Sequence, residues 1–182
     1  MGLAKPVASQ ITLITASMPD RSHLLADMLA SVTAQTVLPS AHFIIIDDRP
    51  LVPKLQELIA KVTTEYVVQV DDDDIIYPNH IETLDANLDA DVVWTWCKVT
   101  GRDWSINEAY QPGVLQQRNY IPSNHARRIS ALEAVGGIAD HAPYDFEDWN
   151  LLRRLELNSA TFKNVPEITW EYRHGLCDQI TR

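Results

Sequence analysis

Short apolar runs alternate with helical patterns along the first hundred residues. Four runs have the length and β-branched content of buried strands, and they cover residues 11–16, 42–46, 66–70 and 92–97. Helices are expected between them: one capped by Asp20, one from Pro53 to about Val62, and one from Pro78 to about Leu88. This alternation predicts right-handed crossovers and a largely parallel sheet in an α/β fold.

The second half of the chain has a less regular pattern. Residues 101–119 are polar, aromatic and rich in turn residues, which predicts a long loop or a short hairpin. Ser130 and Glu133 have the spacing of a capping box, and the helix that they open is expected to stop at Gly136 and Gly137. A last helix near residue 147 and two strands, 161–165 and 168–172, complete the predicted elements.

Size and charge favour one globular domain that does not bind nucleic acid. The chain has 182 residues, and its net charge of −10 is unlike the basic surface that meets phosphates in nucleic-acid binders. Its apolar runs are too short to span a bilayer, and its first ten residues lack the apolar core of a secretory signal. Cys97 and Cys177 are too few for a disulfide framework, and Cys97 fits a buried strand. We therefore expect a cytoplasmic protein.

Polar side chains follow three of the four predicted strands. Residues 15–17 end the first strand, Asp47 and Asp48 follow the second, and residues 71–74 are four consecutive aspartates after the third. Ligands bind at the carboxyl ends of the strands in parallel sheets, so we expect these side chains to share one site.

The four aspartates need a neutralising partner, because adjacent carboxylates repel and raise each other's pKa. Mg²⁺ and Mn²⁺ prefer oxygen ligands, and Asp71 and Asp73 would point the same way in an extended segment. The alternative is a solvated acidic turn before the helix at Pro78. A calcium loop of the EF-hand type is not supported, since its glycine and its terminal glutamate are missing at the required spacing.

Five segments, in order and covering most of the chain, resemble family-2 glycosyltransferases. YVVQVDDDDIIYPNHIETL is similar to their metal-binding segment, where a strand runs into Asp-x-Asp-Asp and a helix-opening Pro. ITLITASMPDRSHLLADMLASVTAQT and FIIIDD resemble the first two strands of the family. NHARRISALEAVGGI with YDFEDWNLLRRL resembles the acceptor-side segment, and EYRHG the closing Tyr-Arg-His element.

The resemblance implies a GT-A fold, a three-layer α/β/α arrangement with a mostly parallel central sheet. It also implies a single domain, with a nucleotide-sugar-binding half over residues 1–100 and an acceptor-binding half over residues 101–182. The implied activity is the transfer of one sugar, with inversion, from a UDP-linked donor to an acceptor hydroxyl. The implied cofactor is Mn²⁺ or Mg²⁺, and the acceptor is a glycan, a protein or a small molecule.

The resemblance also implies a donor site at the first two strand ends. Thr15, Ser17 and Arg21 would lie near the base or the diphosphate, and Asp47 and Asp48 near the uracil or the ribose. For both aspartates, a strand-terminating turn is the alternative interpretation.

The acidic run itself carries the implied metal ligands. Asp73 matches the metal ligand of the family and Asp71 the carboxylate near ribose or metal, while Asp72 occupies a variable position in the donor site. Asp74 is expected to cap the following helix. His174 would add a third metal contact, or else is an ordinary surface histidine.

Asp148 is the expected catalytic base. Its spacing to the three leucines at 151, 152 and 155 places it on the inward face at the start of a helix, where the helix dipole favours the ionised carboxylate. Glu147 would hold an acceptor hydroxyl, or is only a favourable first-turn carboxylate. Trp104 is the candidate platform for a sugar ring, whereas Trp94 and Trp96 are expected in the core.

The sequence departs from the family between its paired aspartates. Only 22 residues separate Asp48 from Asp71, where the family usually has an additional strand and helix. The Gln-x-x-Arg-Trp signature of processive synthases is absent, because Gln179 and Arg182 lack the Trp. The absent signature favours an enzyme that adds a single sugar over a polymerising one. The shortened donor half leaves an inactive nucleotide- or glycan-binding domain as the alternative function. A nucleotidyltransferase is less supported, since no glycine- and lysine-rich loop precedes the first helix.

Overall fold

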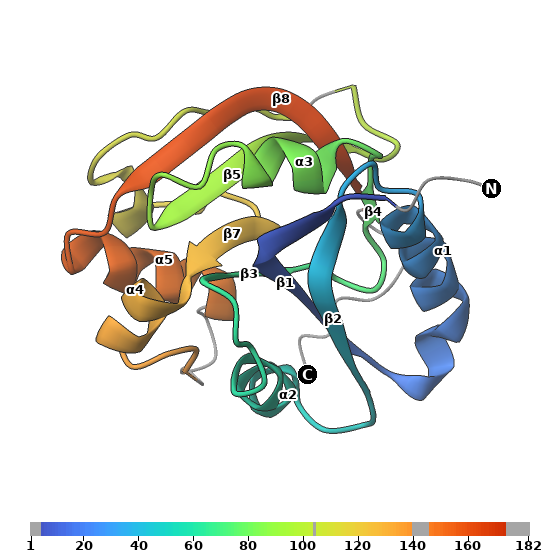
Figure 1. Cartoon of the computed structure of the whole chain (residues 1–182). Helices are drawn as coiled ribbons and strands as arrows, with labels where there is room; N and C mark the ends of the chain where they lie inside the picture. Colours follow the sequence, from blue (N-terminus) through green and yellow to red (C-terminus); the bar gives the residue numbers. More distant parts are fainter. Residues whose placement is uncertain (1–4, 104, 140–145, 174–182) are drawn as a thin grey trace.

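A mixed sheet with helices on both faces forms the protein, and β1 lies between β2 and β3 near one edge of it (Figure 1). The computed structural model describes residues 5–103, 105–139 and 146–173. Within these residues the strands are β1 (Val7–Ser17), β2 (Leu38–Ile46), β3 (Tyr66–Gln69), β4 (Ile75–Ile76), β5 (Val92–Val99), β6 (Ser105–Ile106), β7 (His125–Arg128) and β8 (Phe162–Tyr172). The helices are α1 (Ser22–Thr33), α2 (Leu51–Ile59), α3 (His80–Asp85), α4 (Ile129–Ala134) and α5 (Glu147–Leu157), with short 3-10 turns at Pro19–Arg21 and Val114–Gln116.

The described strands form one mixed sheet in the order β2-β1-β3-β7-β5-β8-β4, and β6 pairs with β5. β1 is parallel to β2 and β3, and β5 is parallel to β8. β7 lies between β3 and β5 and is antiparallel to both, so β1, β2, β3, β5 and β8 all run in one direction. The predicted mostly parallel sheet is confirmed.

Helices cover both faces of the sheet, which confirms the three-layer α/β/α arrangement (Figure 1). On one face, Met28 of α1 and Ile81 of α3 pack into one core cluster. On the other face, Leu55 of α2, Leu132 of α4 and Leu152 of α5 pack into a second cluster. Each helix contributes an apolar stripe, because burying that stripe against the sheet is what stabilises a short helix.

The strand register places the predicted site residues at one edge. Ser17 pairs with Ile46, and Ile14 pairs with Gln69, so β1, β2 and β3 end side by side. The segments that follow β2 and β3 therefore begin next to Ser17. A single helix, α2, makes the crossing from β2 to β3, as the short spacing predicted.

Two predicted caps are wrong. Asp20 lies in the 3-10 turn before α1, whose N-cap position is Arg21 without a side-chain bond. Ser130 lies inside α4 rather than in front of it. The predicted end of α4 is confirmed, since Gly136 has a φ of 80°, a left-handed conformation that favours glycine.

The second half of the chain differs most from the predicted elements. β7 was not predicted, and the two expected C-terminal strands are one continuous strand, β8, with shifted register near Trp96. In the segment 101–119, predicted as a long loop or a short hairpin, residues 105–106 pair with β5, and the other described residues form a loop that contains the 3-10 turn Val114–Gln116. Trp94 and Cys97 are buried as expected, and no described helix is long and apolar enough to cross a membrane.

Candidate active site

The four aspartates form a turn at the end of β3. The backbone N–H of Asp74 donates to the carbonyl of Asp71 at 3.1 Å, which closes residues 71–74. The segment is therefore not extended, and the argument that alternate residues of a strand share a face does not apply to Asp71 and Asp73. Each of the four carboxylates has a different environment.

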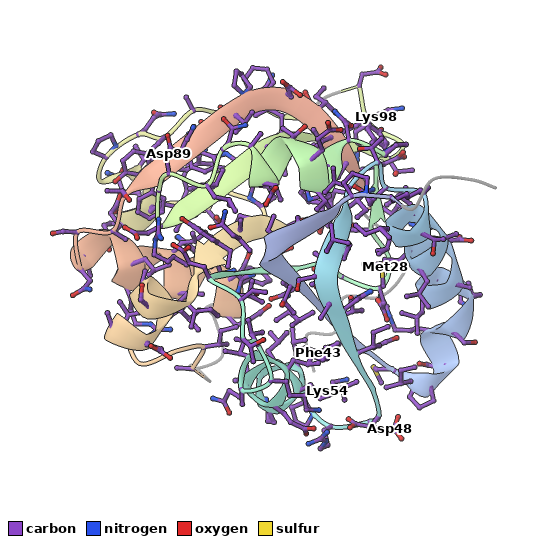
Figure 2. The ribbon with its side chains drawn as sticks, viewed as in Figure 1. Met28, Phe43, Asp48, Lys54, Asp89 and Lys98 are labelled. Carbon is purple, nitrogen blue, oxygen red and sulfur yellow. The ribbon has the colours of Figure 1, made fainter. Side chains whose placement is uncertain are left out.

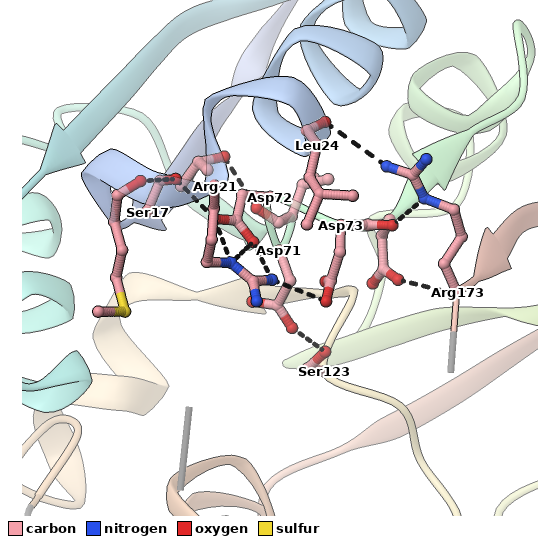
Figure 3. A network of polar contacts seen from close by, with 12 residues as sticks. Ser17, Arg21, Leu24, Asp71, Asp72, Asp73, Ser123 and Arg173 are labelled. Atoms are coloured by element: carbon pink, nitrogen blue, oxygen red, sulfur yellow. Dashed lines mark hydrogen bonds and ion pairs between the residues drawn. The ribbon is translucent and has the colours of Figure 1, made fainter. Parts of the chain in front are cut away.

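Asp72 is the best-anchored carboxylate of the turn (Figure 3). Arg21 Nε lies 2.9 Å from one oxygen of Asp72, and Arg21 Nη2 lies 2.6 Å from the other. Ser17 Oγ donates to the same carboxylate at 2.6 Å. The side chain of Asp72 is 1% exposed. Three predicted donor-site residues, Ser17, Arg21 and Asp72, thus come together and bond to one another.

Asp73 and Asp74 lie between two arginines. Asp73 Oδ2 accepts from Arg21 Nη2 at 2.8 Å, and its backbone carbonyl accepts from the Arg173 guanidinium (Figure 3). The backbone N–H of Arg173 donates to Asp74 Oδ1 at 3.3 Å, while Asp74 Oδ2 is buried without a partner among the described residues. Asp74 does not cap α3, whose N-cap is Asn79, so that expectation is wrong.

Asp71 faces the acceptor-side half of the protein. Its carboxylate accepts from Gln69 Nε2 at 2.9 Å and from Ser123 Oγ at 3.1 Å. Burial, together with the charges of Asp73 and Asp148, raises the pKa of Asp71 to about 6, although these two hydrogen bonds lower it. Asp71 therefore lies within electrostatic reach of the predicted base.

Asp148 and Glu147 open α5, as predicted. Asp148 Oδ1 accepts from the backbone N–H of Trp149 at 2.7 Å, and Oδ2 accepts from Asn119 at 3.2 Å. Burial nevertheless raises the pKa of Asp148, so desolvation outweighs the stabilising helix terminus that the sequence suggested. The pKa of Glu147 rises to about 7, through burial and through the charges of Asp148 and Asp71.

A buried arginine, Arg127 of β7, lies beside these carboxylates and was not predicted. Burial lowers its pKa, while the charges of Asp148, Glu147 and Asp71 raise it. The only sequence signal is the polar His125–Arg128 segment, which does not have the apolar content of a strand. The arginine could be found only by asking what balances three neighbouring carboxylates.

The predicted residues at the ends of β1 and β2 have partners within the protein. Thr15 Oγ1 donates to the Val70 carbonyl at 2.8 Å and lies 2.9 Å from His42 Nε2, inside the sheet. Asp47 accepts from the Arg49 side chain at 2.8 Å. Its backbone N–H donates to the carbonyl of Ser17, the last residue of β1. Asp47 therefore ends β2 within the protein, as the alternative interpretation of a strand-terminating turn describes.

A buried lysine that the sequence did not single out lies at the same strand ends. Lys54 of α2 is fully buried and donates to the carbonyls of Ser17 at 2.8 Å and Asp47 at 3.1 Å. Asp48 follows β2 and is exposed, and its charge acts on Lys54 (Figure 2). The ammonium thus joins the ends of β1 and β2.

The described residues offer only part of a metal site. No group of three or more His, Cys, Asp or Glu side chains among them is placed to hold an ion. Asp71 and Asp73 offer carboxylate oxygens, and Mg²⁺-type sites commonly combine one or two carboxylates with substrate phosphates and water. A hard divalent cation would therefore need diphosphate and water ligands besides Asp71 and Asp73. Trp104 and His174 lie outside the described residues.

Solved glycosyltransferase structures share this fold. Residues 1–349 of S. aureus TarS, in complex with UDP-GlcNAc, match at a TM-score of 0.73 and 13% identity, over 94% of this chain and 60% of that chain. A mannosyltransferase from Pyrobaculum calidifontis, in complex with GDP-Man and Mn²⁺, matches at 0.63 and 15% identity, over 93% and 57%. No family model and no curated protein matches the sequence. The chain has a GT-A-type fold.

Proposed function

We propose that this chain is a metal-dependent glycosyltransferase that transfers one sugar from a UDP-linked donor to an acceptor hydroxyl with inversion. The observation that carries the proposal is the approach of the acidic turn after β3 to the start of α5, where the charge of Asp148 raises the pKa of Asp71. Asp71, a carboxylate of the proposed donor half (residues 1–100), is thus within electrostatic reach of Asp148, the candidate base of the proposed acceptor half (residues 101–182). The fold shared with structures that hold UDP-GlcNAc or GDP-Man supports the same activity.

On the donor side, the ends of β1, β2 and β3 receive the nucleotide. Asp71 and Asp73 hold the cation with the diphosphate, and His174 adds a third contact. The cation, when bound, stabilises the negative charge on the departing diphosphate. The remaining contacts to the base, ribose and diphosphate come from Thr15, Ser17, Arg21, Asp47, Asp48 and Asp72.

On the acceptor side, Asp148 is the general base. An acceptor oxygen attacks the anomeric carbon, the bond from that carbon to the diphosphate oxygen breaks, and the proton of the acceptor hydroxyl moves to Asp148. The hydrogen bonds from Trp149 and Asn119 fix the direction of this carboxylate. Its raised pKa brings it closer to working pH, where a base is most effective. Attack opposite the leaving group inverts the anomeric configuration.

Two further residues complete the proposed acceptor site. Glu147 orients the acceptor hydroxyl, and its position beside Asp148 at the start of α5 supports this role. Trp104 supplies an apolar face for a sugar ring.

The shortened crossing between β2 and β3 favours a second candidate, a domain of the same fold that binds a nucleotide or glycan without catalysis. Asp148→Asn separates the two. An enzyme loses turnover by about 10³-fold or more, as expected for removal of a general base, and keeps its affinity for UDP with Mn²⁺. Donor hydrolysis and calorimetry with UDP-, GDP- and TDP-linked sugars measure both properties. NMR of the product gives the anomeric configuration.

Three results would contradict the proposal. If calorimetry shows no heat of binding with any donor in the presence of Mn²⁺, the proposed nucleotide-sugar site is contradicted. Donor turnover that is unchanged in Asp148→Asn removes Asp148 as the base, and binding without turnover in the wild type favours the non-catalytic domain.

A further inference from the structure

The two consecutive arginines of β7, Arg127 and Arg128, lie in different environments. Arg128 pairs with Asp91 at 3.1 Å and with Glu65, and its guanidinium lies 4.7 Å from the ring centre of Tyr66. Arg127 is 1% exposed and has no ion pair of this kind among the described residues. A fully buried guanidinium is costly unless its donors and its charge are matched. Arg127 therefore needs a structural reason.

The hydrogen bonds of Arg127 lead to one carboxylate by two routes. Arg127 Nη2 donates to Gln69 Oε1 at 3.2 Å and to the backbone carbonyl of Ser123 at 3.1 Å. Gln69 Nε2 then donates to one oxygen of Asp71 at 2.9 Å, and Ser123 Oγ donates to the other at 3.1 Å. Both oxygens of Asp71 are thus held by residues that bind the same guanidinium group.

The contact with Arg127 also decides how the Gln69 amide is oriented. A glutamine amide has one acceptor end and one donor end. Since Arg127 has only donors, it selects the oxygen end of Gln69, and the NH₂ end must then face Asp71. Without Arg127 the amide could turn, and Asp71 would lose a defined partner.

The charge of Arg127 acts on a second set of groups. Glu147 and Asp148 of α5 and Asp71 of the acidic turn all interact electrostatically with it. Arg127 Nε and Nη1 are buried and have no hydrogen-bond partner among the described residues. The positive charge of Arg127 therefore lies between the turn after β3 and the start of α5.

We propose that Arg127 is a positioning residue that fixes the Asp71 carboxylate through Gln69 and Ser123, while its charge balances Glu147 and Asp148. The role in metal and donor binding rests on the proposed function. The hydrogen-bonded connection itself does not, so the two can be tested apart.

The first test measures donor-site binding without turnover. Calorimetry with UDP and MnCl₂ compares the wild type with Gln69→Leu, Arg127→Met and Arg127→Lys. We expect Gln69→Leu and Arg127→Met to weaken binding by about 10- to 100-fold, the usual effect of removing a residue that orients a metal ligand. Arg127→Lys keeps the charge with fewer donors and should fall between them and the wild type. Arg128→Met, on the same strand, is the matched control and should bind like the wild type.

The second test compares pH profiles of kcat/KM. Arg127→Met removes the positive charge that acts on Glu147 and Asp148, so the acid limb should move to higher pH. Asp73 and the neutral Asn119, which also face these carboxyl groups, are unchanged in the variant. Gln69→Leu keeps the charge, so its acid limb should stay in place although its affinity falls. A purely structural role for Arg127 would lower activity without moving the limb.

The third test needs no ligand. Urea unfolding of Gln69→Leu, Arg127→Met and the double variant forms a double-mutant cycle, in which connected residues give non-additive changes. We expect the double variant to lose less than the sum of the single losses. Additive losses, or UDP binding unaffected by Gln69→Leu and Arg127→Met, would overturn the role of Arg127. If the cycle shows coupling but the wild type does not bind UDP with Mn²⁺, the hydrogen-bonded connection between Arg127 and Gln69 stands. The proposed function is then overturned instead.

Discussion

Arg21 and Asp72 form a two-pronged buried ion pair, with Arg21 Nη2 2.6 Å from Asp72 Oδ1 and Arg21 Nε 2.9 Å from Asp72 Oδ2. This geometry is the strong form of the arginine–carboxylate interaction. It ties the turn after β3 to the start of α1, and Ser17 adds a third bond at the end of β1. The buried Asp72 therefore anchors the turn to β1 and to the start of α1.

Asp72→Ala should lower the free energy of unfolding by about 3 kcal/mol, since removing one partner leaves a buried charge without compensation. Urea denaturation measures the loss. Arg21→Met combined with Asp72→Leu should cost less than Asp72→Ala, because neither charge remains. A loss of under about 1 kcal/mol for Asp72→Ala, the size typical of surface pairs, would contradict this prediction.

Glu147→Gln should stabilise the protein, and more so at high pH. The pKa of Glu147 is about 7 in the folded protein, above the value of about 4.3 for an unfolded chain. The folded state then binds more protons between these values, so stability falls as the pH rises through 7. At pH 8.5 the neutral variant should gain about 2 kcal/mol, or about 4–8 °C in Tm, after allowance for partial exposure.

At pH 5 the wild-type Glu147 is already largely protonated when folded, so the gain in Tm should be less than half as large. Scanning calorimetry at the two pH values checks this difference. Glu133→Gln, an exposed position on α4, serves as the control and should change neither value. A gain that does not depend on pH would show that packing, rather than ionisation, is responsible.

Lys54→Met should destabilise the donor edge of the sheet. Lys54 Nζ donates to the carbonyls of Ser17 and Asp47. In the variant the Asp47 carbonyl would lose this donor, and the Ser17 carbonyl would keep only the backbone N–H of Asp47 at 3.4 Å. We expect a loss of about 1–3 kcal/mol by urea denaturation, the cost of removing a donor from buried acceptors. Lys61→Met removes only an exposed pair with Glu57 and should cost under about 0.5 kcal/mol. Equal losses would argue against a special role for Lys54.

Glu156→Ala should release the loop before β7 from α5. Glu156 accepts from Tyr110 Oη at 3.0 Å, from the Gly113 N–H at 2.9 Å and from Gln116 Nε2 at 2.8 Å. Without these bonds, trypsin should cleave after Arg118 about 10-fold faster, as expected if the loop loses about 1.4 kcal/mol of local stability.

Mass spectrometry of the timed digests identifies that cleavage. Glu133→Ala is the control, and its cleavage rate should match the wild type. If Glu156→Ala is cut no faster than the wild type, the stacking of Tyr110 on Phe162, with ring centres 4.6 Å apart, holds the loop by itself.

Elements with a strong apolar period could be predicted from the sequence. β1, α1 and α5 have their buried residues at strand or helix spacing, and the structure confirms each of them. β7 could not be predicted, because His125 and Arg127 are polar residues buried by neighbours from distant parts of the chain. The missed strand also contributes Arg127, so the error in the fold and the missing site residue have one cause.

The alternation of the main strands and helices in the first hundred residues, and with it the edge where the aspartates lie, follows from the sequence, because the burial pattern of each element is set by its own neighbouring residues. The partner of each carboxylate was decided only in three dimensions. Asp72 binds Arg21, Asp71 binds Gln69 and Ser123, and Asp74 receives the N–H of Arg173, a residue 99 positions away. The charge and burial of each carboxylate at such contacts depend on which distant segments fold together. Four consecutive aspartates in the sequence do not contain this information.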